Sequence, residues 1–273
     1  MKKYYLFIAL AMVAAMTVSC KNNNKKAAKT AEANAEVVEA AKTILADDVL
    51  AKIDEIGKPY IDEIGENRFA SIISSHMTEE AKLVKPDYLL EPSEINSLVT
   101  KTQKVNALAI LIADRTMMEA YEMPIEEANE AIARLMAEIG TAFSIENEND
   151  KTISEKITER YQKCKESGDL ALFWQFHFAM MNEFSYLICQ NPDLFFDNLT
   201  EEQHQSFRKR IGTTREVVEI LAEYDPELKL AWDTYSKFRI DNPDEVYNSI
   251  EAAKEYQISR KESLTARRAE MLK

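Results

Sequence analysis

Apolar residues recur at every third or fourth position along most of the chain, which is the spacing of one buried face of an α-helix. No stretch shows the sustained alternation of a strand followed by a hairpin signal such as Asn-Gly. The pattern therefore predicts an all-α protein. Its expected helices cover residues 31–56, 66–76, 79–84, 93–121, 124–140, 153–167, 170–190, 201–224, 226 onward and 243 nearly to the C-terminus.

Composition supports this fold class. Only 5 of the 273 residues are glycine, whereas sheets with tight hairpins need glycine at their turns. Ala, Glu, Lys, Leu and Met, which favour helices, dominate the chain instead. We expect a multi-helix bundle of about eight or nine helices in antiparallel pairs. It forms a single domain over residues 31–273, with a candidate sub-boundary in the polar stretch at residues 145–152.

Local signals mark where several of these helices begin. Ser93 is suited to cap the long helix that follows it, and Thr200 with Gln203 has the spacing of a capping box. Apolar positions stay in phase across Gly212, so we expect that helix to continue through it. The last helix is expected to run unbroken from Pro243. Its face becomes more polar, so its end is expected to project or to meet a partner.

The cysteines inside the domain are too far apart to pair. Cys164 and Cys189 lie on either side of a predicted helical turn at Gly168 and Asp169. At about 1.5 Å per helical residue, Cys164 lies about 6 Å before this turn and Cys189 about 30 Å after it. A disulfide requires Cα atoms within about 7 Å. We therefore expect two separate buried thiols.

The N-terminus has the pattern of a secretory signal. Lys2 and Lys3 form a short basic region, and an apolar run extends from Tyr4 to about Met16 and closes on small or β-branched residues at 17–19. A membrane-spanning helix needs about 20 apolar residues. The run is shorter than that, so we expect residues 1–19 to be a cleaved signal rather than a spanning helix.

Cys20 follows Ser19 directly, and the segment Thr17 to Cys20 resembles the lipobox of bacterial lipoproteins, although Thr17 stands where leucine is usual. The resemblance covers residues 1–20. It implies that Cys20 is diacylated, that the signal is removed and that the new N-terminus is acylated. Two or three acyl chains would make the attachment stable, since each buried CH₂ contributes about 0.8 kcal/mol. The alternative is an ordinary cleaved signal with Cys20 as a free or disulfide-forming thiol.

A basic tether follows the cysteine. Residues 20–30 contain four lysines and no acidic residue, which is typical of a flexible segment close to lipid headgroups. Some Gram-negative bacteria export lipoproteins to the cell surface by an acid-rich tract at this place, and the charge here has the opposite sign. We therefore expect a lipoprotein of the outer membrane that faces the periplasm.

The rest of the chain is strongly acidic. The whole sequence has a formal net charge of −13, and the part from Thr30 onward has 28 basic against 47 acidic residues. Nucleic-acid binding requires a basic surface, so this class of partner is excluded. The acidity either maintains solubility or attracts a cationic partner.

The most unusual helix is the one expected over residues 170–190, because it carries apolar groups on every side. Such a helix forms either the centre of a bundle or the wall of an apolar cavity. The second alternative would make it a binding site for a lipid or another apolar molecule, with help from the adaptable side chains of Met117, Met118 and Met136. The candidate ligand-binding residues are Phe173, Trp174, His177, Met180, Met181, Glu183 and Phe184.

Few residues suggest catalysis or metal binding. His177 and Glu183 are polar groups in an apolar helix, but at six residues apart they point in different directions and form no dyad. A buried polar side chain usually finds a hydrogen-bond partner, and Asp114 and Arg115 could supply partners across the bundle. Glu201 and His204 have the spacing of a di-iron bundle ligand pair, but this motif occurs once rather than twice. We expect no metal and no cofactor.

The sequence favours a non-catalytic role. We expect a lipid-anchored envelope protein that acts as an interaction or assembly component, with an unknown protein partner and with the membrane bound through Cys20. The first alternative is a binding or carrier protein for an apolar small molecule or lipid. The second alternative is an unrecognised hydrolase, since carboxylate pairs such as those of glycosidases have no fixed local spacing.

Overall fold

The computed structural model describes residues 45–64, 72–73, 75–140, 143, 151–236 and 243–273, and the regular secondary structure in these ranges is entirely helical. Within these ranges it has twelve α-helices, one 3₁₀ helix and no strand, so the all-α class is confirmed. The elements are α2 (Asp47–Ile64), α4 (Glu79–Lys82), η1 (Pro92–Ser97), α5 (Lys101–Ala120), α6 (Glu126–Ile139), α7 (Ile153–Ser167), α8 (Leu170–Gln190), α9 (Pro192–Phe196), α10 (Glu201–Ala222), α11 (Pro226–Ser236), α12 (Pro243–Val246), α13 (Ile250–Ser259) and α14 (Lys261–Met271).

Several predictions fall wholly or partly outside the described residues. They are the signal at 1–19, the lipidated Cys20 with its tether to residue 30, the start of the first helix, most of the helix at 66–76 and most of the stretch at 145–152. The described residues all belong to one compact unit, Lys42–Lys273.

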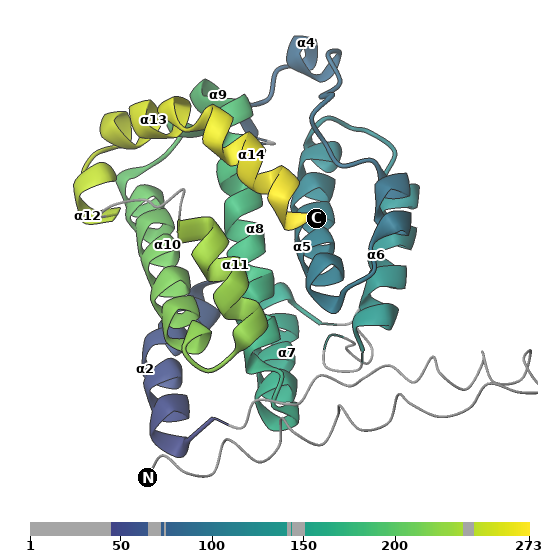
Figure 1. The fold of residues 1–273 in the computed structure, drawn as a ribbon. Coiled ribbons are helices and arrows are strands. Elements are labelled where there is room, and N and C mark those ends of the chain that lie inside the picture. The colour runs from purple at the N-terminus through teal and green to yellow at the C-terminus, as the bar shows by residue number, and fades with distance from the viewer. Residues whose placement is uncertain (1–44, 65–71, 74, 141–142, 144–150, 237–242) are drawn as a thin grey trace, which may run out of the picture. The chain divides into compact units, whose positions relative to one another are not determined.

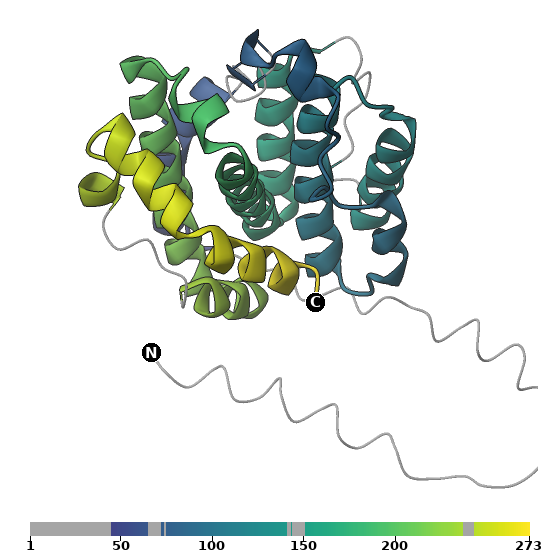
Figure 2. The ribbon, with the colours of Figure 1, turned by 90° about the horizontal axis from the view of Figure 1, so that it is seen from above.

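Helix α8 lies at the centre of the described helices. It contacts α5, α7, α10 and α14, while α2 packs against α10 and α7, and α6 packs against α5. Figure 1 shows α8 between the α5–α6 pair and the α10–α11 pair, and the view from above in Figure 2 shows it end-on with the other helices around it. A helix that is apolar on every side needs neighbours on every side. Helix α8 therefore lies at the centre of the described helices, which is one of the two alternatives that the sequence left open.

Three local predictions about helix ends and continuity are confirmed. The Thr200 side chain accepts from the Gln203 backbone N–H, and the Gln203 side chain accepts from the Thr200 backbone N–H, which makes the expected capping box of α10. Helix α10 continues through Gly212, as predicted. Gly168 ends α7 in the left-handed region at φ 77°, where glycine has no steric penalty.

The predicted start of the long helix at Ser93 is wrong. Residues Pro92–Ser97 form the separate 3₁₀ helix η1, and α5 begins only at Lys101. A second capping box, made by Thr100 and Gln103, fixes this start because it satisfies backbone donors that no helical carbonyl reaches.

The predicted unbroken last helix is also wrong. The chain from Pro243 forms three helices, and Ser249 caps the second of them by accepting from the Ala252 backbone N–H. The C-terminal end does not project. Helix α14 packs against α8 and α5, Met271 is buried, and the Met271 carbonyl accepts a hydrogen bond of 2.9 Å from the Asn106 side chain of α5.

Cys164 and Cys189 are both buried and no disulfide joins them, as predicted. Among the described residues, we find no helix with the length and apolar character that a membrane span requires.

Candidate functional site

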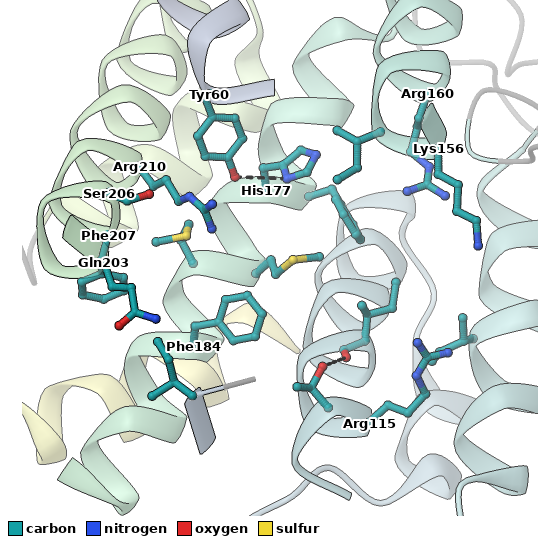
Figure 3. A pocket seen from close by; sticks show the side chains of 18 of the residues that line it. Tyr60, Arg115, Lys156, Arg160, His177, Phe184, Gln203, Ser206, Phe207 and Arg210 are labelled. Atoms are coloured by element: carbon teal, nitrogen blue, oxygen red, sulfur yellow. Dashed lines mark hydrogen bonds between the residues drawn. The ribbon is translucent and has the colours of Figure 1, made fainter. Parts of the chain in front are cut away.

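A cavity of about 420 Å³ opens beside the central helix, and this volume lies within the range of about 300 to 1,000 Å³ that is usual for small-molecule sites. Side chains from α5, α6, α7, α8 and α10 line it, together with Tyr60 of α2 (Figure 3). The α8 side of the cavity is formed by Phe176, His177, Met180, Met181 and Phe184. The helix that the sequence singled out is therefore both the centre of the fold and a wall of the cavity.

The cavity lies where the packing of α8 changes. Its earlier residues, such as Phe173 and Phe176, belong to one core cluster, and its later residues, such as Leu187, belong to a second cluster. Met180, Met181 and Phe184 lie between the two and are only half-buried, although they sit on the most central helix. Unbranched thioethers adapt their shape to irregular space, so this part of the wall can adjust to a ligand.

His177 is the buried polar group of the cavity. Its side chain is 1 % exposed, and its Nδ1 lies 3.2 Å from the Tyr60 hydroxyl, as the dashed line in Figure 3 marks. Burial, with a smaller contribution from the charge of Arg160, lowers the pKa of His177 to about 3. The imidazole is therefore neutral near pH 7. Its Nε2 has no hydrogen-bond partner within the described part of the chain.

Four basic side chains line the same cavity. Lys156 and Arg160 extend from α7, Arg115 from α5 and Arg210 from α10. In Figure 3 the first three lie on one side of the cavity, and Arg210 lies on the other side with Gln203 and Ser206. None of the described lining residues is acidic.

The structure separates the candidate residues into three groups. His177, Met180, Met181 and Phe184 line the cavity. Phe173 and Trp174 instead pack into the core, with ring centroids 5.2 Å from Tyr161 and 5.4 Å from Tyr60, respectively. Glu183 lies on another face of α8, which follows from its spacing of six residues from His177 at 100° per residue. Of the earlier methionines, Met136 lines the cavity, while Met117 is in the second core cluster.

Glu183 belongs to a buried charged cluster outside the cavity. Arg268 of α14 donates through Nε to both Glu183 carboxylate oxygens, at 2.8 and 2.9 Å, and through Nη2 to Asp114 at 2.9 Å. Asp114 also accepts from the Leu90 backbone N–H at 2.7 Å. Asp114 is therefore a partner across the bundle, as the sequence suggested, whereas Arg115, named for the same role, lines the cavity.

Protonation of this cluster follows from its burial. Two carboxyl groups share one guanidinium in a site from which water is largely excluded, so both cannot easily be ionised. Burial and, second to it, the charge of Asp114 raise the pKa of Glu183 well above its ordinary value. Glu183 thus retains a proton that it would release in water, and the cluster ties α5, α8 and α14 together.

The Glu201 and His204 pair of α10 is not part of a metal-binding cluster among the described residues. His204 is buried, and its Nδ1 lies 4.0 Å from a carboxylate oxygen of Glu201. No group of three or more acidic, histidine or cysteine side chains suited to a metal occurs among the described residues.

The basic lining residues were not predicted from the sequence. They lie on three different helices, and in an acidic chain with 34 lysines and arginines no single one stands out. The available signal was the pair Lys156 and Arg160, which share one face of α7 at a spacing of four residues beside the apolar Ile157.

Comparison with known proteins gives no relative. No protein-family model, no curated protein and no solved structure matches the chain significantly.

Proposed function

We propose that the protein binds an apolar ligand in the cavity beside α8. The observation that carries the proposal is the half-buried group Met180, Met181 and Phe184 on the most central helix of the described fold. Apolar side chains at such a position are normally buried by their neighbours. A ligand that fills the cavity would bury these three side chains. Each Å² of apolar surface that is removed from water contributes about 25 cal/mol to the free energy of binding.

The placement of the carboxyl groups favours binding over hydrolysis. Glu183 and Asp114 are turned away from the cavity and are occupied by Arg268. Among the described lining residues the cavity presents cations and a neutral His177, without a carboxylate to serve as nucleophile or base. An assembly role ranks second, and it is favoured by the exposed apolar side chains of Leu83, Val84 and Val99.

The cellular placement that we propose rests on the sequence. Acyl groups on Cys20 would hold the protein at the outer membrane, and the lysines of residues 20–30 would lie against the headgroups on the periplasmic side. The acidic helical unit would be held away from anionic lipid by its own charge. In this proposal its helices pack as antiparallel pairs, and its ligand comes from the envelope.

Native mass spectrometry and thermal unfolding test the ligand proposal. The full chain with Cys20→Ala, which carries no acyl group of its own, is incubated with lipids extracted from the producing cell envelope and then separated from unbound lipid. We expect a retained mass of one small molecule and a melting temperature that rises with lipid concentration, because a ligand that binds only the folded state stabilises it. Absence of both effects would refute the proposal.

A matched pair of variants locates the site. Met180→Trp places a large ring in the cavity, whereas Leu230→Trp adds the same ring at an exposed position of α11. We expect the first variant to lose at least about tenfold in lipid affinity, equivalent to about 1.4 kcal/mol, and the second to bind as the parent does. Equal binding by both would place the ligand elsewhere on the chain.

A further inference from the structure

We propose that the ligand is an amphiphile with one anionic headgroup, and that its head lies among Arg115, Lys156 and Arg160 while its chain lies against Met180, Met181 and Phe184. This inference rests on the proposed function, because it names the class of molecule that the same cavity would hold.

The charge of the cavity is opposite to the charge of the chain. Acidic residues outnumber basic ones by 47 to 34 over the whole sequence, yet the described lining residues include four cations and no acid. A cavity for a neutral hydrocarbon would gain nothing from these cations, since bringing charge toward an apolar space costs solvation energy. An anionic group on the ligand would offset that cost.

Three of the cations converge on one side. Lys156 and Arg160 are four residues apart on α7, so they share a face and repel each other. Arg115 lies on the same side of the cavity (Figure 3), where it donates to the Asn129 side chain at 3.1 Å and lies 3.5 Å from a Glu119 oxygen. These contacts fix the position of Arg115 beside the cavity. An anion between the three side chains would be attracted by all of them.

Arg160 is the most buried of these cations. Its side chain is 5 % exposed, and its guanidinium lies over the rings of Phe143 and Phe176 at 5.7 and 5.9 Å. Its charge acts on His177, whose pKa it lowers together with burial. Arg160 therefore brings a positive charge to a side of the cavity where water is scarce, and a charge there acts more strongly on a ligand charge than it would in bulk water.

His177 can add a hydrogen bond to the headgroup. When the Tyr60 hydroxyl donates to Nδ1, the neutral ring carries its proton on Nε2. This atom has no other partner in the described part of the chain and belongs to a side chain that lines the cavity. A carboxylate or phosphate oxygen is a suitable acceptor for it.

The other side of the cavity suits the alkyl chain. Phe184 and Phe207 lie there in Figure 3, and Leu199 and Met181 also line the cavity. Arg210 is also on that side, but it is a single cation against three. We therefore assign the head to the side of Arg115, Lys156 and Arg160.

A set of ligands with the same chain separates this inference from the proposed function. The full chain with Cys20→Ala is titrated by calorimetry with decanoate, decyl phosphate, 1-decanol and decyltrimethylammonium. We expect decanoate or decyl phosphate to bind at least about tenfold more tightly than the alcohol, as for one charge-assisted hydrogen bond or more, and the cation to bind most weakly. The order of the two anions distinguishes a carboxylate head from a phosphate head.

Two other outcomes of this titration would contradict the proposals. Equal affinity for anion, alcohol and cation would overturn the anionic headgroup and leave the apolar cavity as proposed. Absence of binding by all four would overturn both proposals.

Variants on α7 test the position of the head. Lys156→Gln removes one charge from the cavity, and Lys163→Gln removes one charge from the same helix outside the lining. We expect Lys156→Gln to weaken the binding of the anion about five- to tenfold relative to that of 1-decanol, and Lys163→Gln to change neither affinity. A loss that is equal for anion and alcohol would contradict the assignment of the head. If Lys156→Gln does not fold, the comparison of the four ligands on the parent chain still decides.

Discussion

His177 makes the stability of the protein depend on pH through a single buried imidazole. Burial lowers its pKa from the ordinary value of about 6.5 to about 3, so the unfolded chain binds a proton below pH 6.5 that the folded protein excludes. The stability contributed by the neutral ring is therefore present above pH 6.5 and is lost as the pH falls. The slope is about 1.4 kcal/mol per pH unit.

We expect His177→Gln to remove this pH dependence. In urea unfolding at pH 7 and pH 5, the free energy of unfolding of the wild type should fall by about 2 kcal/mol more than that of the variant, since the proton on His177 is the difference between them. Groups that both proteins share cancel in this comparison. Parallel behaviour of wild type and variant would mean that His177 is accessible to protons in the folded state.

Glu183 should make stability depend on pH in the opposite direction to His177. Because burial and Asp114 raise its pKa well above the ordinary value, the folded protein retains a proton that the unfolded chain releases, and this stability is lost as the pH rises. Glu183→Gln resembles the protonated carboxyl. We expect the stability of the wild type relative to this variant to decrease between pH 5 and pH 8 in urea unfolding.

A second carboxyl provides the control for Glu183. Thr152 lowers the pKa of the exposed Glu155 through hydrogen bonds from its hydroxyl and its backbone N–H, so this carboxylate is ionised in the folded and unfolded states across the same pH range. The stability difference between the wild type and Glu155→Gln should therefore not change with pH. A constant difference for Glu183→Gln as well would show that the buried cluster does not hold a proton.

Sequence could predict only part of these residue environments. The tie between Glu183 and Asp114 was anticipated because both are polar groups on apolar faces, but Arg268 lies 85 residues from Glu183 on a helix whose docking had been missed. The orientation of Trp174 into the core depends on how closely α2 approaches α8. No local pattern encodes that distance.

At the scale of elements, one close helix contact depends on a glycine. A Cβ atom placed on Gly57 of α2 would lie 2.5 Å from a ring carbon of Trp174 on α8, whereas nothing lies within 4 Å of a Cβ atom placed on Gly212 of α10. Both glycines are inside helices, so their helix propensities are alike. Only the contact differs between them.

We therefore expect the same substitution to have opposite effects at the two positions. Gly57→Ala should lower the free energy of unfolding by about 1 to 3 kcal/mol, because the buried ring must move. Gly212→Ala should raise it by up to about 1 kcal/mol, because alanine loses less backbone entropy in a helix. Chemical denaturation measures both. Stabilisation by both substitutions would mean that α2 does not pack closely on Trp174.

Elements were predicted best where their signals are local. The capping box at Thr200 and the terminal glycine at Gly168 lie within a few residues of the helix ends they determine. The start of α5 was predicted wrongly although Thr100 and Gln103 carry the same signal, because Ser93 and the apolar phase before Lys101 suggested an earlier start. The break in the last helix was missed although the Ser249 cap of α13 is a local signal, because the apolar positions stay in phase past it.

At the scale of the whole molecule, the side chains of the helices around α8 do not fill all the space beside it, and this leaves the cavity. An apolar pattern predicts that a helix is surrounded, but the same pattern fits both a filled neighbourhood and a cavity wall. The difference depends on the side chains of six other described helices and on where two core clusters meet. The central helix was therefore predictable, and the cavity beside it was not.

The membrane placement that we propose depends on acylation of the Cys20 sulfur. The part of the chain from Thr30 onward is acidic, so anionic headgroups should repel it. Acyl chains on Cys20 would be the attachment, and the nearby lysines alone would give only a salt-sensitive contact.

We expect cells fed a labelled fatty acid to incorporate the label into the wild type, which should sediment with membranes and resist washing with 1 M salt, since about two acyl chains hold a protein stably. Cys20→Ala should carry no label and appear in the soluble fraction. Lys25→Ala, which alters the tether and keeps the sulfur, should behave as the wild type does. Salt-resistant sedimentation of Cys20→Ala would show that another part of the chain provides the anchor.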